Sequence, residues 1–76
     1  METRVLRYFI EIARCGSMTK AADVLHVSQS ALSKQMNSLE EELGKKLFRR
    51  GSRNVFLTEE GLIFKKRAED IVDMID

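Results

Sequence analysis

The residues that could do chemistry lie at the front of one short segment of the chain. Ser28 is suited to cap a helix, and the exposed residues that follow it are small or polar. These residues are Gln29, Ser30, Ser33, Lys34 and Asn37. Hydrogen-bonding side chains at the front of a helix are typical of a helix-turn-helix, whose second helix contacts base edges in the major groove of DNA.

An ordinary amphipathic helix explains the same segment, because every surface helix has a polar face. The apolar side of this helix would be formed by Leu32, Met36, Leu39 and Leu43. The glutamates Glu40–Glu42 come a turn or more after the polar front, and phosphate would repel them. If the helix binds DNA, we expect only its first two turns to face the duplex. This helix alone leaves both interpretations open.

The residues before this helix predict a packing partner and a tight turn. Ser17 or Thr19 would cap a short helix whose adjacent alanines, residues 21–22, let a second helix cross closely. His26 stands where the chain must reverse, and His is enriched among non-glycine residues at positive φ. A metal ligand or a general base is the alternative for His26, but no cluster of Cys, His or Asp surrounds it in the sequence.

A basic segment follows, with five basic residues and no acidic residue between positions 44 and 58. Within it, residues 47–49 and 55–57 alternate like two short strands. This pattern predicts a small hairpin, a wing beside the helix-turn-helix. A local basic patch in a chain of low net charge would concentrate an anionic partner at one surface.

The predicted hairpin has a basic tip and two aromatic residues. Arg50 and Arg53 would lie at the flexible tip, where they could reach a phosphate or a narrow minor groove. A merely solvated basic loop is the alternative. We expect Phe48 and Phe56 in the core rather than as stacking platforms for bases, because each stands beside a leucine in the strand pattern.

The first and last helices carry apolar stripes. In a helix predicted over residues 2–14, the stripe is formed by Leu6, Phe9, Ile10 and Ala13, and Arg7 and Glu11 are spaced as an ion pair. Thr58 would cap the last helix. Its stripe is formed by Phe64, Ala68, Ile71 (or Val72) and Ile75. Because this stripe is longer than a small core needs, we expect the start of the helix to pack internally and its end to support a dimer.

Length and composition limit the remaining possibilities. Seventy-six residues allow one small domain, and 43% apolar residues without Pro, at helical spacing, indicate a mainly α fold. The single Cys15 has no disulfide partner, and with no base nearby in the sequence we expect a packing residue rather than a reactive thiol. The net charge of +1 makes global charge a poor argument for nucleic acid.

The sequence contains no signal peptide and no apolar run of the roughly 20 residues that a membrane span needs. We therefore expect a cytoplasmic protein with no membrane partner. It also lacks a nucleophile–base set, a phosphate loop and a metal cluster, so it predicts no enzyme and no metal site.

The chain resembles, over its whole length, the N-terminal DNA-binding domain of LysR-type transcriptional regulators. The most specific matches are Ala21-Ala22 with Leu25, Ser28-Gln29, Ser33, Leu39-Glu40, Leu43-Gly44, Leu47-Phe48-Arg49-Arg50 and Leu57-Thr58-Glu59 with Gly61. The resemblance implies a winged helix-turn-helix with a three-helix core, a small β-hairpin wing and the start of a long C-terminal linker helix. Residues 1–58 would form the DNA-binding domain, and residues 59–76 the start of the linker and dimerisation helix.

The resemblance also implies a function. Members of this family bind double-stranded DNA sequence-specifically, as dimers on interrupted inverted repeats, and often form tetramers at full length. A C-terminal domain, absent from this sequence, senses a small-molecule effector, so no cofactor is expected in this chain. Two positions depart from the family pattern, with Ser30 in place of the usual Pro and Met18 in place of a common aromatic residue.

Matching the family residue by residue assigns candidate DNA contacts. The major-groove candidates are Gln29, Ser30, Ser33 and Lys34. The minor-groove candidates at the wing are Arg50 and Arg53, and the phosphate candidates are Ser17, Thr19, Lys20 and Ser28. The alternative function is a winged-helix module that binds protein without DNA, which the acidic run and the near-neutral charge favour.

Overall fold

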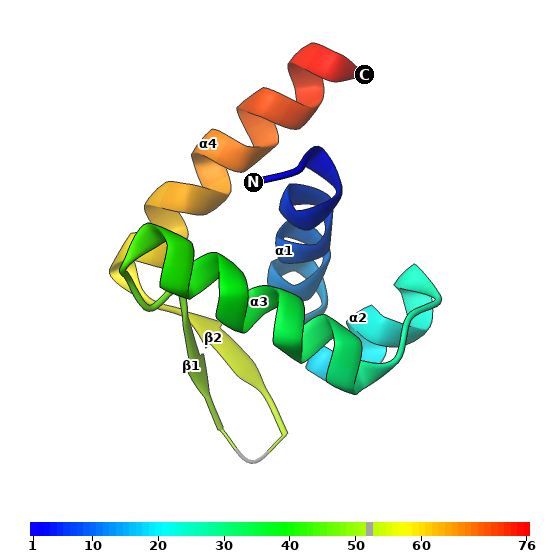
Figure 1. Cartoon of the computed structure of the whole chain (residues 1–76). Helices are drawn as coiled ribbons and strands as arrows, with labels where there is room; N and C mark the ends of the chain where they lie inside the picture. Colours follow the sequence, from blue (N-terminus) through cyan, green and yellow to red (C-terminus); the bar gives the residue numbers. More distant parts are fainter. Residues whose placement is uncertain (52) are drawn as a thin grey trace.

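A computed structural model of the chain describes residues 1–51 and 53–76 (Figure 1). The elements of these residues are α1 (Thr3–Cys15), α2 (Met18–Leu25), α3 (Gln29–Leu43), β1 (Phe48–Arg50), β2 (Val55–Leu57) and α4 (Glu59–Ile75). Figure 1 shows α3 lying across the front of α1, the hairpin projecting below α3, and α4 leading away to the C-terminus. The predicted mainly α winged helix-turn-helix is confirmed, with element ends shifted by about one residue.

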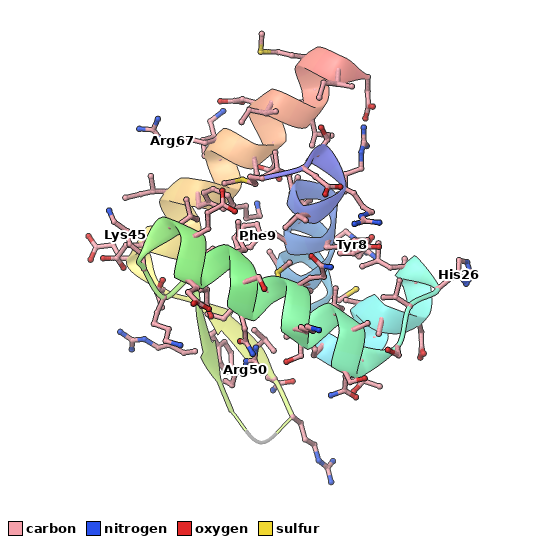
Figure 2. All side chains as sticks on the ribbon, viewed as in Figure 1. Tyr8, Phe9, His26, Lys45, Arg50 and Arg67 are labelled. Atoms are coloured by element: carbon pink, nitrogen blue, oxygen red, sulfur yellow. The ribbon has the colours of Figure 1, made fainter. Side chains whose placement is uncertain are left out.

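Three of the helices begin at a residue whose side chain caps the helix, as the sequence predicted. The hydroxyls of Ser17, Ser28 and Thr58 each accept a hydrogen bond from the backbone N–H three residues further on. At the end of α2, His26 adopts a φ of 58°, the left-handed conformation that the turn to α3 requires. Figure 2 shows the His26 ring pointing away from the protein, so the residue serves the turn.

The core is centred on Phe9 of α1 (Figure 2). Its ring contacts Phe48 of β1 at a centroid distance of 5.1 Å and Phe64 of α4, edge to face, at 5.0 Å. Ile12, which the predicted stripe of α1 omitted, is fully buried, whereas Ile10 is only partly buried. The expected stripe was incomplete because α1 contacts α2, α3 and α4, which surround more than one face of it.

The hairpin is confirmed, but two of its side chains lie elsewhere than predicted. Arg49 of β1 pairs with Phe56 of β2, and the alternation of the strand leaves Phe56 59% exposed. The prediction that Phe56 belongs to the core was therefore wrong. Arg50 is part of β1 rather than of the tip. Ser52, which belongs to the predicted tip, lies outside the described residues.

Helix α4 is held near both of its ends, by the base of the wing at its start and by α1 at its end. Near its start, Gly61 lies so close to the carbonyl oxygen of Leu47 that an added Cβ would overlap it. At its end, the Asp76 carboxylate accepts hydrogen bonds of 3.1 and 2.5 Å from the Arg7 guanidinium. The expected pair of Arg7 with Glu11 is not formed, because Arg7 reaches across to α4 instead.

The apolar stripe of α4 is divided between the core and the surface. Ala68 is buried and Phe64 is half-buried against Phe9, so these two dimerisation candidates are occupied within the chain. Ile71 and Ile75 are 45% and 58% exposed. None of the helices in the described part of the chain is long and apolar enough to cross a bilayer.

Candidate nucleic-acid interface

A groove of about 610 Å³ lies between the starts of α2 and α3 and the wing. It brings together seven of the ten side chains that the sequence proposed for DNA. They are Ser17, Thr19 and Lys20 at the start of α2, Gln29 and Ser33 of α3, and Arg50 and Arg53 of the wing. The other three, Ser28, Ser30 and Lys34, are exposed on or just before α3 but do not line the groove.

The groove has the electrostatic character of an anion site. Three of its described lining residues, Lys20, Arg50 and Arg53, are basic, and none is acidic. The first residues of α2 and α3 also line it, and the unpaired N–H groups of helix N-termini favour negative charge. A polyanion such as the phosphate backbone of DNA would be attracted here although the whole chain carries a charge of only +1.

Helix α2 orients the front of α3 through a side-chain hydrogen bond. The Thr19 hydroxyl donates to the Gln29 Oε1 atom over 3.1 Å. The Ser28 hydroxyl accepts from the Ala31 N–H at 3.1 Å and lies 3.4 Å from the Ser30 hydroxyl. Two of the residues proposed for phosphate therefore also have roles within the protein, as a support for Gln29 and as a helix cap.

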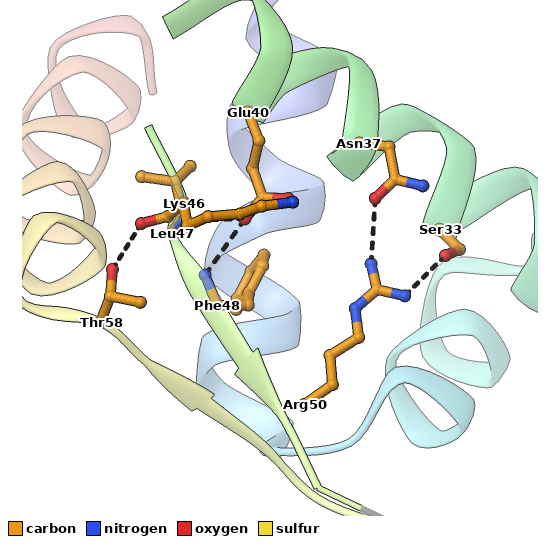
Figure 3. Close-up of polar contacts among 8 residues, drawn as sticks. All are labelled: Ser33, Asn37, Glu40, Lys46, Leu47, Phe48, Arg50 and Thr58. Carbon is orange, nitrogen blue, oxygen red and sulfur yellow. Dashed lines mark hydrogen bonds and ion pairs between the residues drawn. The ribbon is translucent and has the colours of Figure 1, made fainter. Parts of the chain in front are cut away.

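The wing contacts α3 from the other side through Arg50 (Figure 3). Its Nη1 donates to the Ser33 hydroxyl at 3.1 Å, and its Nη2 donates to the Asn37 Oδ1 atom at 3.3 Å. The expectation that Arg50 reaches outward from a flexible tip was wrong, because its place in β1 directs the side chain onto α3. Arg53 is exposed in the loop between the strands.

A buried carboxylate holds the rear of α3 to the base of the wing (Figure 3). Glu40 is only 7% exposed, and its Oε2 atom accepts from the backbone N–H groups of Leu47 at 2.7 Å and Phe48 at 3.2 Å. Glu40 thus faces the protein, whereas Glu41 and Glu42 of the same run are exposed. The spacing of Glu40, one helical turn from the buried Met36, was the signal in the sequence that could have placed it.

The wing is also tied to the end of α1. The Val55 N–H donates to the carbonyl oxygen of Gly16 over 3.0 Å, and the Thr58 hydroxyl donates to that of Lys46 over 2.6 Å. The first bond joins β2 to the end of α1, and the second joins the two flanks of the hairpin to each other. The hairpin therefore holds a defined position beside α3.

Cys15 lines the groove but has the environment of a packing residue. Its thiol donates to the Glu11 carboxylate over 3.2 Å. Burial, together with the hydrogen bond to Glu11, raises the pKa of Cys15, which disfavours the nucleophilic thiolate. Among the described residues, no group of three His, Cys, Asp or Glu side chains is placed to hold a metal ion.

The three-helix core, the tight turn before α3 and the adjoining basic hairpin define a winged helix-turn-helix module. The model of the bacterial regulatory helix-turn-helix proteins of the lysR family matches residues 3–62. The chain belongs to this family.

Relatives and solved structures agree with this assignment. The HTH-type transcriptional regulator BenM of Acinetobacter baylyi is 47% identical over the whole chain, and the regulator BudR of Klebsiella aerogenes is 49% identical over the whole chain. The chain spans 25% of the length of BenM and 53% of that of BudR.

Two DNA complexes have the same fold. The complex of the BenM DNA-binding domain with catB site 1 DNA superimposes with a TM-score of 0.95 at 47% identity, covering 100% of this chain and 84% of that one. The complex of the CbnR DNA-binding domain with DNA gives a TM-score of 0.95 at 43% identity, covering 99% of this chain and 86% of that one.

Proposed function

We propose that the chain is the sequence-specific, double-stranded-DNA-binding domain of a bacterial LysR-type transcriptional regulator, acting on chromosomal DNA in the cytoplasm. The observation that carries this proposal is the groove, where basic and polar side chains from α2, α3 and the wing converge without an acidic residue among the described ones. The fold that this chain shares with two DNA complexes supports it.

In the proposed complex, the front of α3 enters the major groove. Gln29, Ser30, Ser33 and Lys34, which we call the reading surface, would face the base edges. Arg53, exposed in the wing loop, would lie at the adjacent minor groove, where a narrow A·T-rich groove attracts Arg.

The start of α2 would contact the DNA backbone. Ser17, Thr19 and Lys20 stand at the N-terminus of α2, and Ser28 stands at that of α3. A hydroxyl that already serves as a cap or support can still bond a phosphate through its remaining donor or acceptor capacity. These contacts would fix the register of α3 without reading sequence.

We further propose that residues 59–76 begin a dimerisation helix separate from the DNA-binding unit of residues 1–58. Beside the buried face of α4, a second stripe of large apolar side chains remains exposed, formed by Ile63, Ile71, Met74 and Ile75 at 54%, 45%, 86% and 58%. Pairing with α4 of a second copy would cover this stripe and present two reading surfaces to an inverted repeat. In the whole regulator, a small-molecule effector would bind a further domain, and dimers would join as tetramers.

The test is binding of the chain to labelled random-sequence duplex DNA over a series of salt concentrations. Each phosphate that a basic side chain neutralises adds about 0.9 to the slope of log affinity against log salt. With Lys20, Lys34, Arg50 and Arg53 at the surface, we expect a slope of about 3 to 4 per bound copy. Lys20→Ala should lower the slope by about 1, and Lys66→Ala, on α4, serves as the matched control and should not.

A flat response to salt would overturn the DNA-binding proposal and favour a module that binds protein. That alternative rested partly on the acidic run of α3. It is weakened by Glu40, whose carboxylate is occupied by backbone N–H groups inside the protein.

A further inference from the structure

The contacts of Arg50 determine which atoms α3 can offer to DNA (Figure 3). A guanidinium group has N–H donors and no acceptor. The Ser33 hydroxyl and the Asn37 Oδ1 atom, which face Arg50 at 3.1 and 3.3 Å, must therefore both act as acceptors toward it. Chemistry rather than geometry alone fixes the direction of these two hydrogen bonds.

Each of these oxygens keeps a second lone pair, but the groups on the two side chains that remain wholly unused are donors. A serine hydroxyl that accepts from Arg50 still has its own proton to donate, and an asparagine whose oxygen is occupied presents its NH₂ group. The neighbours on α3 have the same polarity. The Gln29 Oε1 atom already accepts from Thr19 whereas its NH₂ group is unused, and Lys34 can only donate.

We propose that Arg50 is a positioning residue that gives the front of α3 a donor polarity. The base edge that fits this surface is one rich in acceptors, which in the major groove means guanine N7 and O6 or thymine O4. Adenine presents one acceptor beside an amino donor, and cytosine presents an amino donor alone, so both fit it less well. This inference rests on the proposed DNA-binding function and deepens it by naming the chemical class of base edge that is preferred.

Charge strengthens the arrangement. Hydrogen bonds from a guanidinium are stronger than those between neutral groups, and the fork of Arg50 spans one helical turn of α3. Two of its five N–H donors are used, so the remaining ones can meet a phosphate while the fork stays in place. Arg50 can thus contribute to DNA affinity and to the polarity of α3 at the same time.

The experiment is selection of binding sites from random duplex DNA, run in parallel on the unmutated chain and on Arg50→Gln. Glutamine both donates and accepts, so the oxygens of Ser33 and Asn37 are no longer held. We expect the unmutated chain to enrich guanine or thymine at the positions opposite Ser33 and Asn37. In Arg50→Gln this preference should fall about five-fold, the low end of the discrimination given by paired hydrogen bonds.

Arg49→Gln is the matched control, since it removes the same charge from the same strand. The side chain of Arg49 is exposed and makes no hydrogen bond or ion pair with another described residue. This variant should bind all sequences less tightly with an unchanged base profile. Arg50→Lys keeps the charge but loses the two-pronged guanidinium, so it should shift the base profile partway. It replaces Arg50→Gln in the experiment if circular dichroism shows that Arg50→Gln is unfolded.

The outcomes separate this inference from the function on which it rests. An unchanged base profile in Arg50→Gln, or enrichment of adenine or cytosine opposite Ser33 and Asn37 by the unmutated chain, would overturn the positioning role alone. Absence of any DNA binding by the unmutated chain would overturn the proposed function and this inference with it. An effect of Arg50→Gln that shrinks in a Ser33→Ala background would support action through Ser33.

Discussion

The two ends of α3 are held by different kinds of hydrogen bond. At the front, side chains meet side chains at the surface, with Thr19 on Gln29 and Arg50 on Ser33. At the rear, the buried carboxylate of Glu40 accepts from two backbone N–H groups at the base of the wing. The front of α3 is held at the surface, where solvent can replace a partner, and the rear is held by a buried contact.

This difference indicates that the rear of α3 stabilises the fold and that its front recognises DNA. A surface hydrogen bond between side chains can be exchanged for one to a base at little cost, because water or the ligand replaces the lost partner. A buried backbone N–H that loses its partner has no such replacement. We therefore expect substitutions at the rear of α3 to change stability, and those at the front to change the choice of sequence.

The largest effect is expected from Glu40→Ala. It leaves the N–H groups of Leu47 and Phe48 without their acceptor, at a cost of about 1–3 kcal/mol for each buried group. The free energy of unfolding, measured by urea denaturation, should fall by about 2–6 kcal/mol. Glu41→Ala removes an exposed neighbouring charge and should change it by less than about 0.5 kcal/mol. Equal effects of the two variants would show that the rear of α3 is not held by this carboxylate.

At the front, Gln29→Ala should change recognition rather than folding. Removing one base-reading side chain should relax the preference at one base position per half-site, at a cost of about 1–3 kcal/mol. Selection of binding sites measures this, and thermal unfolding should be nearly unaffected. Gln35→Ala is the control, because Gln35 faces the start of α1 beside Glu2 and Val5. A base profile that Gln29→Ala leaves unmoved would remove Gln29 from the reading surface.

A smaller effect is expected at the wing loop. Arg53→Ala removes a charge that we place in the minor groove, so affinity should fall most on duplexes with A·T-rich flanks. The difference between A·T-rich and G·C-rich flanks should shrink by about 1 kcal/mol, the scale of a surface charge contact. Titrations of both duplexes with the unmutated chain and the variant measure it. Equal losses on both flanks would place Arg53 on phosphate instead.

The sequence predicted the parts of this comparison unequally. The helix ends at Ser28 and Thr58 and the turn at His26 follow from local chemistry, and the structure confirms them. The contacts of Arg50 with Ser33 and of Glu40 with Leu47 cross 17 and 7 residues. Such contacts depend on where the hairpin lies against α3, and no periodicity within one element contains that information.

For a related reason, the sequence did not predict how the apolar side chains of α4 are divided between the core and the surface. A stripe at helical spacing shows that one face is apolar but does not show what covers it. Ala68 is covered by the chain itself, whereas Ile75, two turns further along the same stripe, is exposed. Only the packing of α4 on α1 determines which of these two side chains is buried.

The smallest effect extends the comparison to a surface contact far from the reading surface. Hydrogen bonding to Arg7 lowers the pKa of Asp76 below its ordinary value of about 3.9. A carboxyl group with a lowered pKa in the folded state stabilises the fold above its ordinary pKa, and this contribution is lost as the pH falls through the folded value. Arg7→Gln should raise the pKa of Asp76, measured by NMR titration of its carboxyl carbon. The melting temperature should drop slightly at pH 6, with the difference disappearing in acid.

Lys66→Gln, which breaks the contact with Asp70, is the control and should leave the titration of Asp76 unchanged. An Asp76 that titrates at its ordinary pKa in the unmutated chain would show that the end of α4 is not held to α1 in solution.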